Sequence, residues 1–282
     1  MEASTASAGA EPPHTRPVAR ATASPLGGLA AYAAELLGTL MLVFCIGMVV
    51  SINSGDGLGV TDFAVIGLVH TFVLMMLVLS LGSASGAHFN PAVTISLLVT
   101  RKIRGADAAI YIVVQLVGAV LGAFLVKALL LNEGDAVGYG SLAIADAAPA
   151  PAAAPGAPPA PTGPDWLGGS VLGGLVAEGI GTFFLMWAIM ALAVNPRGER
   201  HWAAFGIGAT LGLMVMILAP LTGAGLNPAR WLGPALASGT WDDAWVFIVG
   251  PVIGAVLAAF LYAAIVLEPQ ARVGERPIDV LD

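Results

Sequence analysis

The sequence predicts an all-α membrane protein, in which six transmembrane helices surround two shorter helices that enter the membrane without crossing it. Three observations predict this fold class. Of the 282 residues, 57% are apolar and only 10% are charged, whereas soluble domains carry about 25% charged residues. Six long apolar segments recur through the chain, and two short apolar segments each begin with an Asn-Pro-Ala triplet. This composition excludes an ordinary soluble enzyme.

The long segments have the length of membrane-spanning helices, since about 20 apolar residues are needed to cross about 30 Å of hydrocarbon. Hydropathy places them at 28–52, 62–82, 107–131, 170–194, 201–220 and 243–267. The short segments, 90–100 and 227–237, are only about half as long as a span at 1.5 Å per residue. We therefore expect two half-helices that cannot span the membrane.

Basic residues indicate the orientation of the chain. If the six segments alternate in direction, all but two of the Lys and Arg residues fall on one side: Arg16, Arg20, Arg101, Lys102, Arg104, Arg197, Arg200, Arg272 and Arg276. Cytoplasmic loops carry an excess of Lys and Arg. We therefore expect a multi-pass protein of the plasma (inner) membrane with both termini in the cytoplasm. The exceptions are Lys127, at the outer end of the third segment, and Arg230, beside the second triplet.

The two halves of the chain are related by an internal repeat. Residues 34–39 (AELLGT) resemble residues 177–182 (AEGIGT), and each stretch is followed by a triplet. The repeats lie 143 residues apart at Glu35 and Glu178, and 137 residues apart at Asn90 and Asn227. Each copy contains three spans, an odd number, so the second copy must be inverted relative to the first. One half-helix then enters from each face of the membrane.

The repeat also predicts the domain organisation. The first repeat covers residues 26–142 and the second covers residues 165–268. Residues 143–164 are almost entirely Ala, Pro and Gly, a composition typical of an extended linker. We expect this extracellular linker to be a passive connector rather than a lid. Residues 1–25 contain no apolar core of a cleaved signal peptide, so we expect a disordered cytoplasmic tail there and a second cytoplasmic tail at 269–282.

The triplets Asn90-Pro91-Ala92 and Asn227-Pro228-Ala229 favour a pore. In each triplet Asn occupies an N-cap position and Pro the first helical position, as at an ordinary helix start. Two such starts at matching places in an inverted repeat, however, bring two helix N-termini together near the membrane midplane. Their positive dipole ends disfavour cations. The Asn amides can donate to a passing water and interrupt the chain along which protons hop.

The residues around the triplets resemble the paired signatures of the aquaporin (major intrinsic protein) family. The resemblance rests on residues 85–94 (SGAHFNPAVT) and 227–230 (NPAR), and it extends over about residues 28 to 267. It implies a homotetramer in which each protomer has its own pore, and passive conduction of water without a cofactor. The richness in Ala, Gly and Pro is compatible with a bacterial member of the family.

The resemblance also implies a second constriction on the outer side. Matching by offset assigns its four positions to His70, Val215, Ala224 and Arg230. A permanent charge such as Arg230 is costly in a membrane unless it faces water or backbone carbonyls, which independently favours the pore. This set of four is similar to the selectivity filter of plant tonoplast intrinsic proteins, several of which pass ammonia, urea or hydrogen peroxide as well as water.

Other readings of the function remain open. A glycerol facilitator of the same family is one alternative, because residues 220–223 (PLTG) look more like the glycerol branch, although Trp231 and Ala235 depart from its pattern. An inverted-repeat secondary active transporter is an alternative of another class. A purely adhesive or scaffolding membrane protein is a third.

The remaining polar residues are assigned to support of the pore. Glu35 and Glu178 could form a proton relay, but their symmetric positions favour a structural role, and in the family the matching carboxylates accept hydrogen bonds from the re-entrant loops. His88 is expected to support its loop or to line the inner vestibule rather than to bind a metal, because no second His, Cys or carboxylate stands at ligand spacing. We expect no metal site, no nucleic-acid partner and no enzymatic activity.

Overall fold

The computed structural model describes residues 27–53, 62–145 and 170–269, and the secondary structure in these ranges is entirely helical. Six helices are long and apolar enough to cross a membrane, which confirms the predicted spans. They are α1 (Leu29–Asn53), α2 (Phe63–Ser85), α4 (Gly105–Leu129), α6 (Val171–Ile189), α7 (Ala203–Thr222) and α9 (Val246–Tyr262). The tail predicted at 1–25, most of the linker predicted at 143–164 and nearly all of the tail predicted at 269–282 lie outside the described residues.

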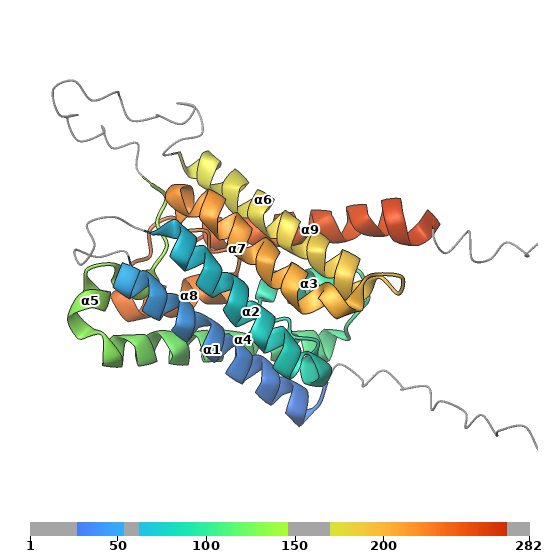
Figure 1. The fold of residues 1–282 in the computed structure, drawn as a ribbon, viewed down its shortest axis with the longest axis horizontal. Coiled ribbons are helices and arrows are strands. Elements are labelled where there is room, and N and C mark those ends of the chain that lie inside the picture. The colour runs from blue at the N-terminus through green and yellow to red at the C-terminus, as the bar shows by residue number, and fades with distance from the viewer. Residues whose placement is uncertain (1–26, 54–61, 146–169, 270–282) are drawn as a thin grey trace, which may run out of the picture.

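The two helices that begin at the Asn-Pro-Ala triplets are too short to span. The first, α3 (Pro91–Val99), has 9 residues, and the second, α8 (Pro228–Ser238), has 11. Each begins with Pro, whose missing N–H costs nothing in the first turn of a helix. In Figure 1, α3 lies toward the right end of the bundle and α8 toward the left end. The two half-helices therefore approach the centre of the bundle from opposite ends.

Several short helical elements were not predicted. A short helix, α5 (Leu131–Asp135), and a 3₁₀ turn, η1 (Gly138–Gly140), follow α4, and a second 3₁₀ turn, η3 (Arg200–Trp202), precedes α7. The helices α6 and α9 each continue through a π-helical turn, η2 (Met190–Val194) and η4 (Ala263–Leu267). Of these elements, η1 contributes directly to the site described below.

The packing follows the inverted repeat. In the first repeat α1 packs against α2 and α4, and in the second α6 packs in the same way against α7 and α9. The halves are joined by contact between α2 and α7, and each half-helix packs against a span of the other repeat: α3 against α9, and α8 against α4. Each repeat therefore supplies a packing surface for the half-helix of the other repeat.

Glycines let the paired spans approach closely. A Cβ atom added to Gly118 or Gly122 of α4 would collide with backbone carbonyls of α1, and one added to Gly254 of α9 would collide with the carbonyl of Gly179 in α6. Small residues at such positions are typical of helix packing in membranes. Ridges of larger side chains would separate these helices and open the bundle.

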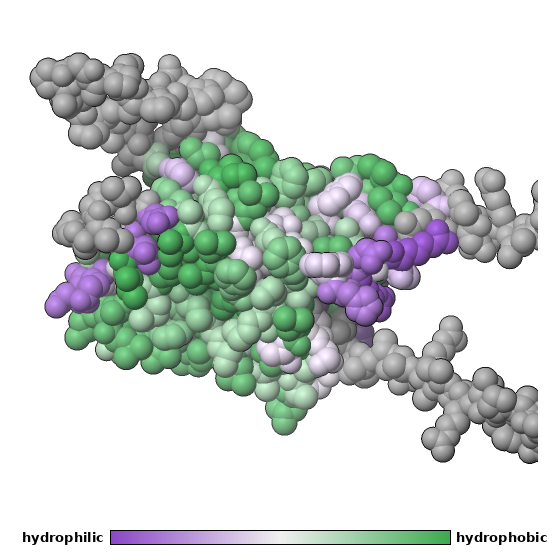
Figure 2. Space-filling model, viewed as in Figure 1, coloured by the Kyte–Doolittle hydropathy of each residue, from purple (hydrophilic) through white to green (hydrophobic). Residues whose placement is uncertain are grey.

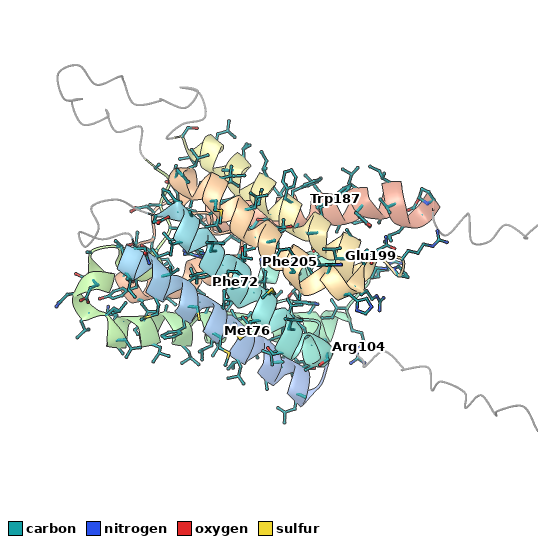
Figure 3. All side chains as sticks on the ribbon, in the orientation of Figure 1. Phe72, Met76, Arg104, Trp187, Glu199 and Phe205 are labelled. Atoms are coloured by element: carbon teal, nitrogen blue, oxygen red, sulfur yellow. The ribbon has the colours of Figure 1, made fainter. Side chains whose placement is uncertain are left out.

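The surface has the polarity of a membrane protein. Figure 2 shows an apolar middle with hydrophilic residues gathered at the two ends. Large side chains on the flank, including Phe72, Met76 and Phe205 in Figure 3, are about half exposed. In Figure 1 the described part of α1 begins, and α9 ends, at the right end of the bundle. Arg104 and Glu199 lie at this same end in Figure 3.

Candidate functional site

Two loops of matching geometry meet inside the bundle. The loop before α3 contains Ala87 and Phe89 at φ of 54° and 47°, and the loop before α8 contains Ala224 and Leu226 at 49° and 51°. Residues with side chains rarely adopt this left-handed conformation, so surrounding contacts must hold it. Because the four residues stand at equivalent places in the two repeats, the two loops have the same backbone conformation at these positions.

Buried carboxylates supply those contacts. In the first repeat, Glu35 accepts hydrogen bonds from the Ser85 hydroxyl at 2.6 Å, from the backbone N–H groups of His88 and Phe89 at 2.9 and 2.7 Å, and from the Gln115 amide at 2.7 Å. These contacts satisfy backbone donors that would otherwise be unpaired in an apolar interior. The carboxylate therefore fixes the loop that carries Asn90.

The second repeat repeats this arrangement. Glu178 accepts from the Thr222 hydroxyl at 2.7 Å and from the N–H groups of Gly225 and Leu226 at 2.9 and 2.6 Å. Both carboxylates are fully buried, with 0% exposure. Ser85 and Thr222 in turn accept a hydrogen bond from the backbone two residues later. Sequence reasoning missed these two hydroxyls, although their matching positions in the two repeats were a usable signal.

The two triplet asparagines cross-link the loops. Asn90 and Asn227 each cap their own half-helix, accepting at Oδ1 from the N–H of the residue two positions later at 2.9 Å. Their amide groups donate across the junction, from Asn90 to the Leu226 carbonyl at 2.8 Å and from Asn227 to the Phe89 carbonyl at 2.9 Å. Each amide group has two hydrogens, so one of them is left for a molecule in the adjoining cavity.

A narrow cavity of about 30 Å³ adjoins this junction, with room for about two water molecules. Its polar lining comes from five side chains, namely His70, His88, Asn90, Asn227 and Arg230. Its remaining lining is mostly apolar and comes from both repeats, and it includes Leu42, Ile46, Leu74, Leu185, Ile189 and Leu211. A cavity of this volume has room only for small molecules.

Two of the four residues assigned to the outer constriction face this cavity. His70 Nδ1 lies 2.8 Å from the Ile66 carbonyl oxygen, which can only accept, so Nδ1 carries the hydrogen and Nε2 of the neutral ring is an acceptor. Neither His70 Nε2 nor Arg230 Nε, both buried, has a hydrogen-bond partner among the described residues. Two residues that line the cavity therefore carry an unpaired acceptor, His70 Nε2, and an unpaired donor, Arg230 Nε.

The other two residues of that set are not among the lining residues of the cavity. Val215 and Ala224 are 0% and 1% exposed and belong to the apolar cluster beside the cavity. Gly225, which follows Ala224, is among the lining residues. The structure therefore brings His70 and Arg230 to one cavity, whereas Val215 and Ala224 are buried and do not line it.

The carbonyl oxygen of Gly140 is a further functional group that sequence reasoning missed. Arg230 Nη1 donates a 2.6 Å hydrogen bond to it. Arg230 is 3% exposed, so its guanidinium relies on this carbonyl and on the cavity for its polar contacts. A backbone carbonyl carries no sequence signature, and residue type alone could not have identified it.

His88 lies at the base of the first loop. Its Nδ1 is 3.1 Å from the Thr94 hydroxyl, and its ring meets the Tyr111 ring edge to face with centroids 5.1 Å apart. Within the described residues there is no group of three or more His, Cys, Asp or Glu side chains that could hold a metal ion. His88 therefore both lines the cavity and supports its loop.

Comparison with known proteins identifies the family. A sequence model of the major intrinsic protein family matches residues 23–262. The chain belongs to the major intrinsic protein family. Its members are membrane channels rather than enzymes, which agrees with the six spans and the cavity. The two Asn-Pro-Ala triplets, Asn90 to Ala92 and Asn227 to Ala229, are consistent with this membership.

Relatives within the family have different names and sources. Nodulin-26 from Glycine max is 35% identical over 231 residues, which cover 81% of this chain and 75% of that protein. Glycerol uptake facilitator protein-like 6 from Lactiplantibacillus plantarum is 34% identical over 231 residues, covering 81% and 94%. The solved structure of the aquaglyceroporin from Plasmodium falciparum has a TM-score of 0.66 at 22% identity, covering 86% of this chain and 98% of that chain. This last likeness confirms the fold.

Proposed function

We propose that this major intrinsic protein is a passive pore for water that also admits small neutral solutes such as ammonia, urea and hydrogen peroxide, and that it excludes ions and protons. The observation that carries the proposal is the junction of the two loops. Asn90 and Asn227 hold the loops together and keep amide hydrogens for the cavity. A water that accepts from both amides points its own hydrogens away from the junction, which interrupts proton transfer.

Charge supports the exclusion of cations. The half-helices α3 and α8 begin at the junction, so their positive dipole ends face the cavity. Arg230 adds a permanent positive charge to the same cavity. A cation entering a cavity of about 30 Å³ would lose its hydration and meet like charge. A neutral molecule does not face this barrier.

The constriction supports a preference for solutes that both donate and accept hydrogen bonds. His70 Nε2 can accept from such a solute, and Arg230 Nε can donate to it. Water, ammonia, urea and hydrogen peroxide all carry donors and acceptors. His70 and Arg230 line the cavity, and Val215 and Ala224 complete the set of four positions that is similar to the filter of the tonoplast intrinsic proteins.

Glycerol transport is the second candidate, because one relative is named a glycerol uptake facilitator protein-like protein. Stopped-flow light scattering on proteoliposomes, challenged in turn with sucrose, glycerol and urea, decides between them. We expect rapid shrinkage in sucrose and re-swelling faster with urea than with glycerol. Glycerol entry faster than urea entry would favour the facilitator. Solute uptake that saturates and requires an ion gradient would instead indicate a secondary transporter.

We further propose a homotetramer in the plasma membrane of a bacterium, with both termini cytoplasmic. Each protomer encloses its own cavity, and its flank offers large apolar side chains to lipid or to neighbouring protomers. The exposed basic residues Arg101, Lys102 and Arg200 lie in the connections that the positive-inside rule assigns to the cytoplasm. Size-exclusion chromatography with light scattering tests the tetramer, and protease access to each tail in sealed vesicles tests the orientation.

A further inference from the structure

Arg230 is held from two directions. Its backbone lies in the first turn of α8, and its Nη1 donates to the Gly140 carbonyl in the turn η1. Arg230 Nε is buried without a partner among the described residues, so the hydrogen bond to Gly140 decides where the guanidinium points. Whatever fixes η1 relative to α8 therefore fixes the width of the constriction.

The turn η1 needs outside support. Its three residues, Gly138, Tyr139 and Gly140, have φ of 56°, 54° and 85°. Glycine adopts this left-handed region freely, but Tyr139 does so at a cost in free energy. The Tyr139 ring is 2% exposed and packs in an apolar cluster with Val43, Val126 and Ala237. Contacts to this ring therefore hold the turn in place.

Lys127 contacts both the turn η1 and the helix α8. It lies in the last turn of α4 and is half-buried. Its Nζ is 5.0 Å from the centroid of the Tyr139 ring, which is a cation–π contact. The same Nζ donates a 2.6 Å hydrogen bond to the carbonyl oxygen of Ala237 in the last turn of α8. A carbonyl at a helix C-terminus has no partner within its helix and favours a cation.

We propose that Lys127 is a positioning residue that sets the solute selectivity of the pore. Its ammonium ties η1, which carries the acceptor for Arg230, to the C-terminal end of α8, whose first turn carries Arg230 itself. Lys127 does not line the cavity and acts through Tyr139 and Ala237. This inference rests on the proposed function, and it explains why a basic residue stands on the side of the membrane where few others are found.

The test compares urea and water permeability in proteoliposomes. Lys127→Met keeps most of the length of the side chain and removes the charge, so Arg230 should gain freedom and the constriction should widen. We expect the ratio of urea to water permeability to rise about threefold to tenfold. Lys127→Arg, which can still donate to Ala237 and lie over the ring, should restore the original ratio. Lys102→Met, an exposed lysine near the other end of the bundle, is the matched control and should leave it unchanged.

Two changes at Tyr139 test the contact between Lys127 and the Tyr139 ring through the aromatic partner. Tyr139→Phe keeps the ring and loses only two hydroxyl contacts of 3.4 Å, so the permeability ratio should not change. Tyr139→Leu removes the ring and should raise the ratio as Lys127→Met does. Because both changes remove the contact between Lys127 and the ring, the effect of the double variant should be smaller than the sum of the two single effects.

The outcomes separate positioning from bulk stability. A purely structural role would lower the amount of folded protein and leave the ratio of the two permeabilities unchanged, and that result in Lys127→Met would overturn the inference. If Lys127→Met does not fold, an unchanged ratio in Tyr139→Leu would overturn it equally. If liposomes that contain the wild-type protein show no osmotic water flow, the proposed function itself is overturned. This measurement precedes those on the variants, so the two failures can be distinguished.

Discussion

The side-chain amide of Asn90 donates a 2.8 Å hydrogen bond to the carbonyl oxygen of Leu226, 136 residues later in the chain. The equivalent bond in the other repeat joins the Asn227 amide to the Phe89 carbonyl oxygen at 2.9 Å. Each asparagine thus caps its own half-helix and holds the loop of the opposite repeat. The two repeats are joined at the point where the cavity is most polar, so the junction is both the structural centre of the bundle and its proposed barrier to protons.

Asn90→Ala should destabilise the protein. The change removes the cap from the Ala92 N–H and leaves the buried Leu226 carbonyl without its partner, at a combined cost of about 2–4 kcal/mol. The midpoint of thermal unfolding in detergent, followed by tryptophan fluorescence, should fall clearly. Asn53→Ala is the control, because that amide bonds only within its own helix. Equal shifts in both variants would show that the cross-link contributes nothing.

Glu178→Gln should weaken the second loop although it barely alters side-chain size. Both carboxylate oxygens accept hydrogen bonds, from Thr222 and Gly225 on one side and from Leu226 on the other. A glutamine amide must turn its NH₂ toward one of these donors, which costs about 2–4 kcal/mol. Glu199→Gln, at an exposed position, should be neutral. Unchanged thermal stability and water permeability in Glu178→Gln would refute the supporting role.

Arg230→Val should widen the constriction and remove its charge. Arg230 lines the cavity, and its guanidinium donates a hydrogen bond to the Gly140 carbonyl. We expect the ratio of urea to water permeability to rise by about tenfold. Arg200→Val, a change at an exposed arginine outside the pore, should not alter the ratio. Stopped-flow measurements on proteoliposomes check both, and an unchanged ratio in Arg230→Val would remove Arg230 from the filter.

His70→Phe should reduce urea and ammonia permeability more than water permeability. The phenyl ring keeps the bulk of the side chain but removes the Nε2 acceptor that faces the cavity. His70→Gln, which retains an acceptor, should recover part of the urea flux. Equal losses for water and urea in His70→Phe would mean that the residue sets only the width of the pore.

Mercurials should not block water flow. The only cysteine in the sequence is Cys45, a free thiol that packs against the apolar cluster and does not line the cavity. Osmotic shrinkage of proteoliposomes should therefore be the same before and after treatment with mercuric chloride. Inhibition that Cys45→Ser abolishes would place the thiol in the water path and contradict the cavity lining.

The sequence predicted the elements whose signals are local. Hydropathy located the six spans, and Pro91 and Pro228 marked the starts of the half-helices. The positions of Glu35 and Glu178 in the repeat led us to expect a supporting role, and both carboxylates accept hydrogen bonds from the loop backbone. These features have local sequence signals because they depend on residue type and spacing.

What the sequence could not predict depends on tertiary contact. The asparagine amides donate to carbonyls of the opposite loop, and Arg230 donates to Gly140, so the partner is in each case a backbone group with no identity of its own. Lys127 appeared only as an exception to the distribution of charge, because its hydrogen bond to Ala237 joins segments 110 residues apart and its contact with Tyr139 depends on the turn that follows α4. Val215 was assigned to the filter by offset; its side chain is fully buried, and its role in the filter stays a prediction.

The most direct test of the central claim is osmotic water flow through the purified protein in liposomes, measured by stopped-flow light scattering at several temperatures. A passive pore should make proteoliposomes shrink much faster than protein-free liposomes, with a weaker temperature dependence than the bare bilayer and no need for an ion gradient. Shrinkage no faster than in protein-free liposomes would contradict the account.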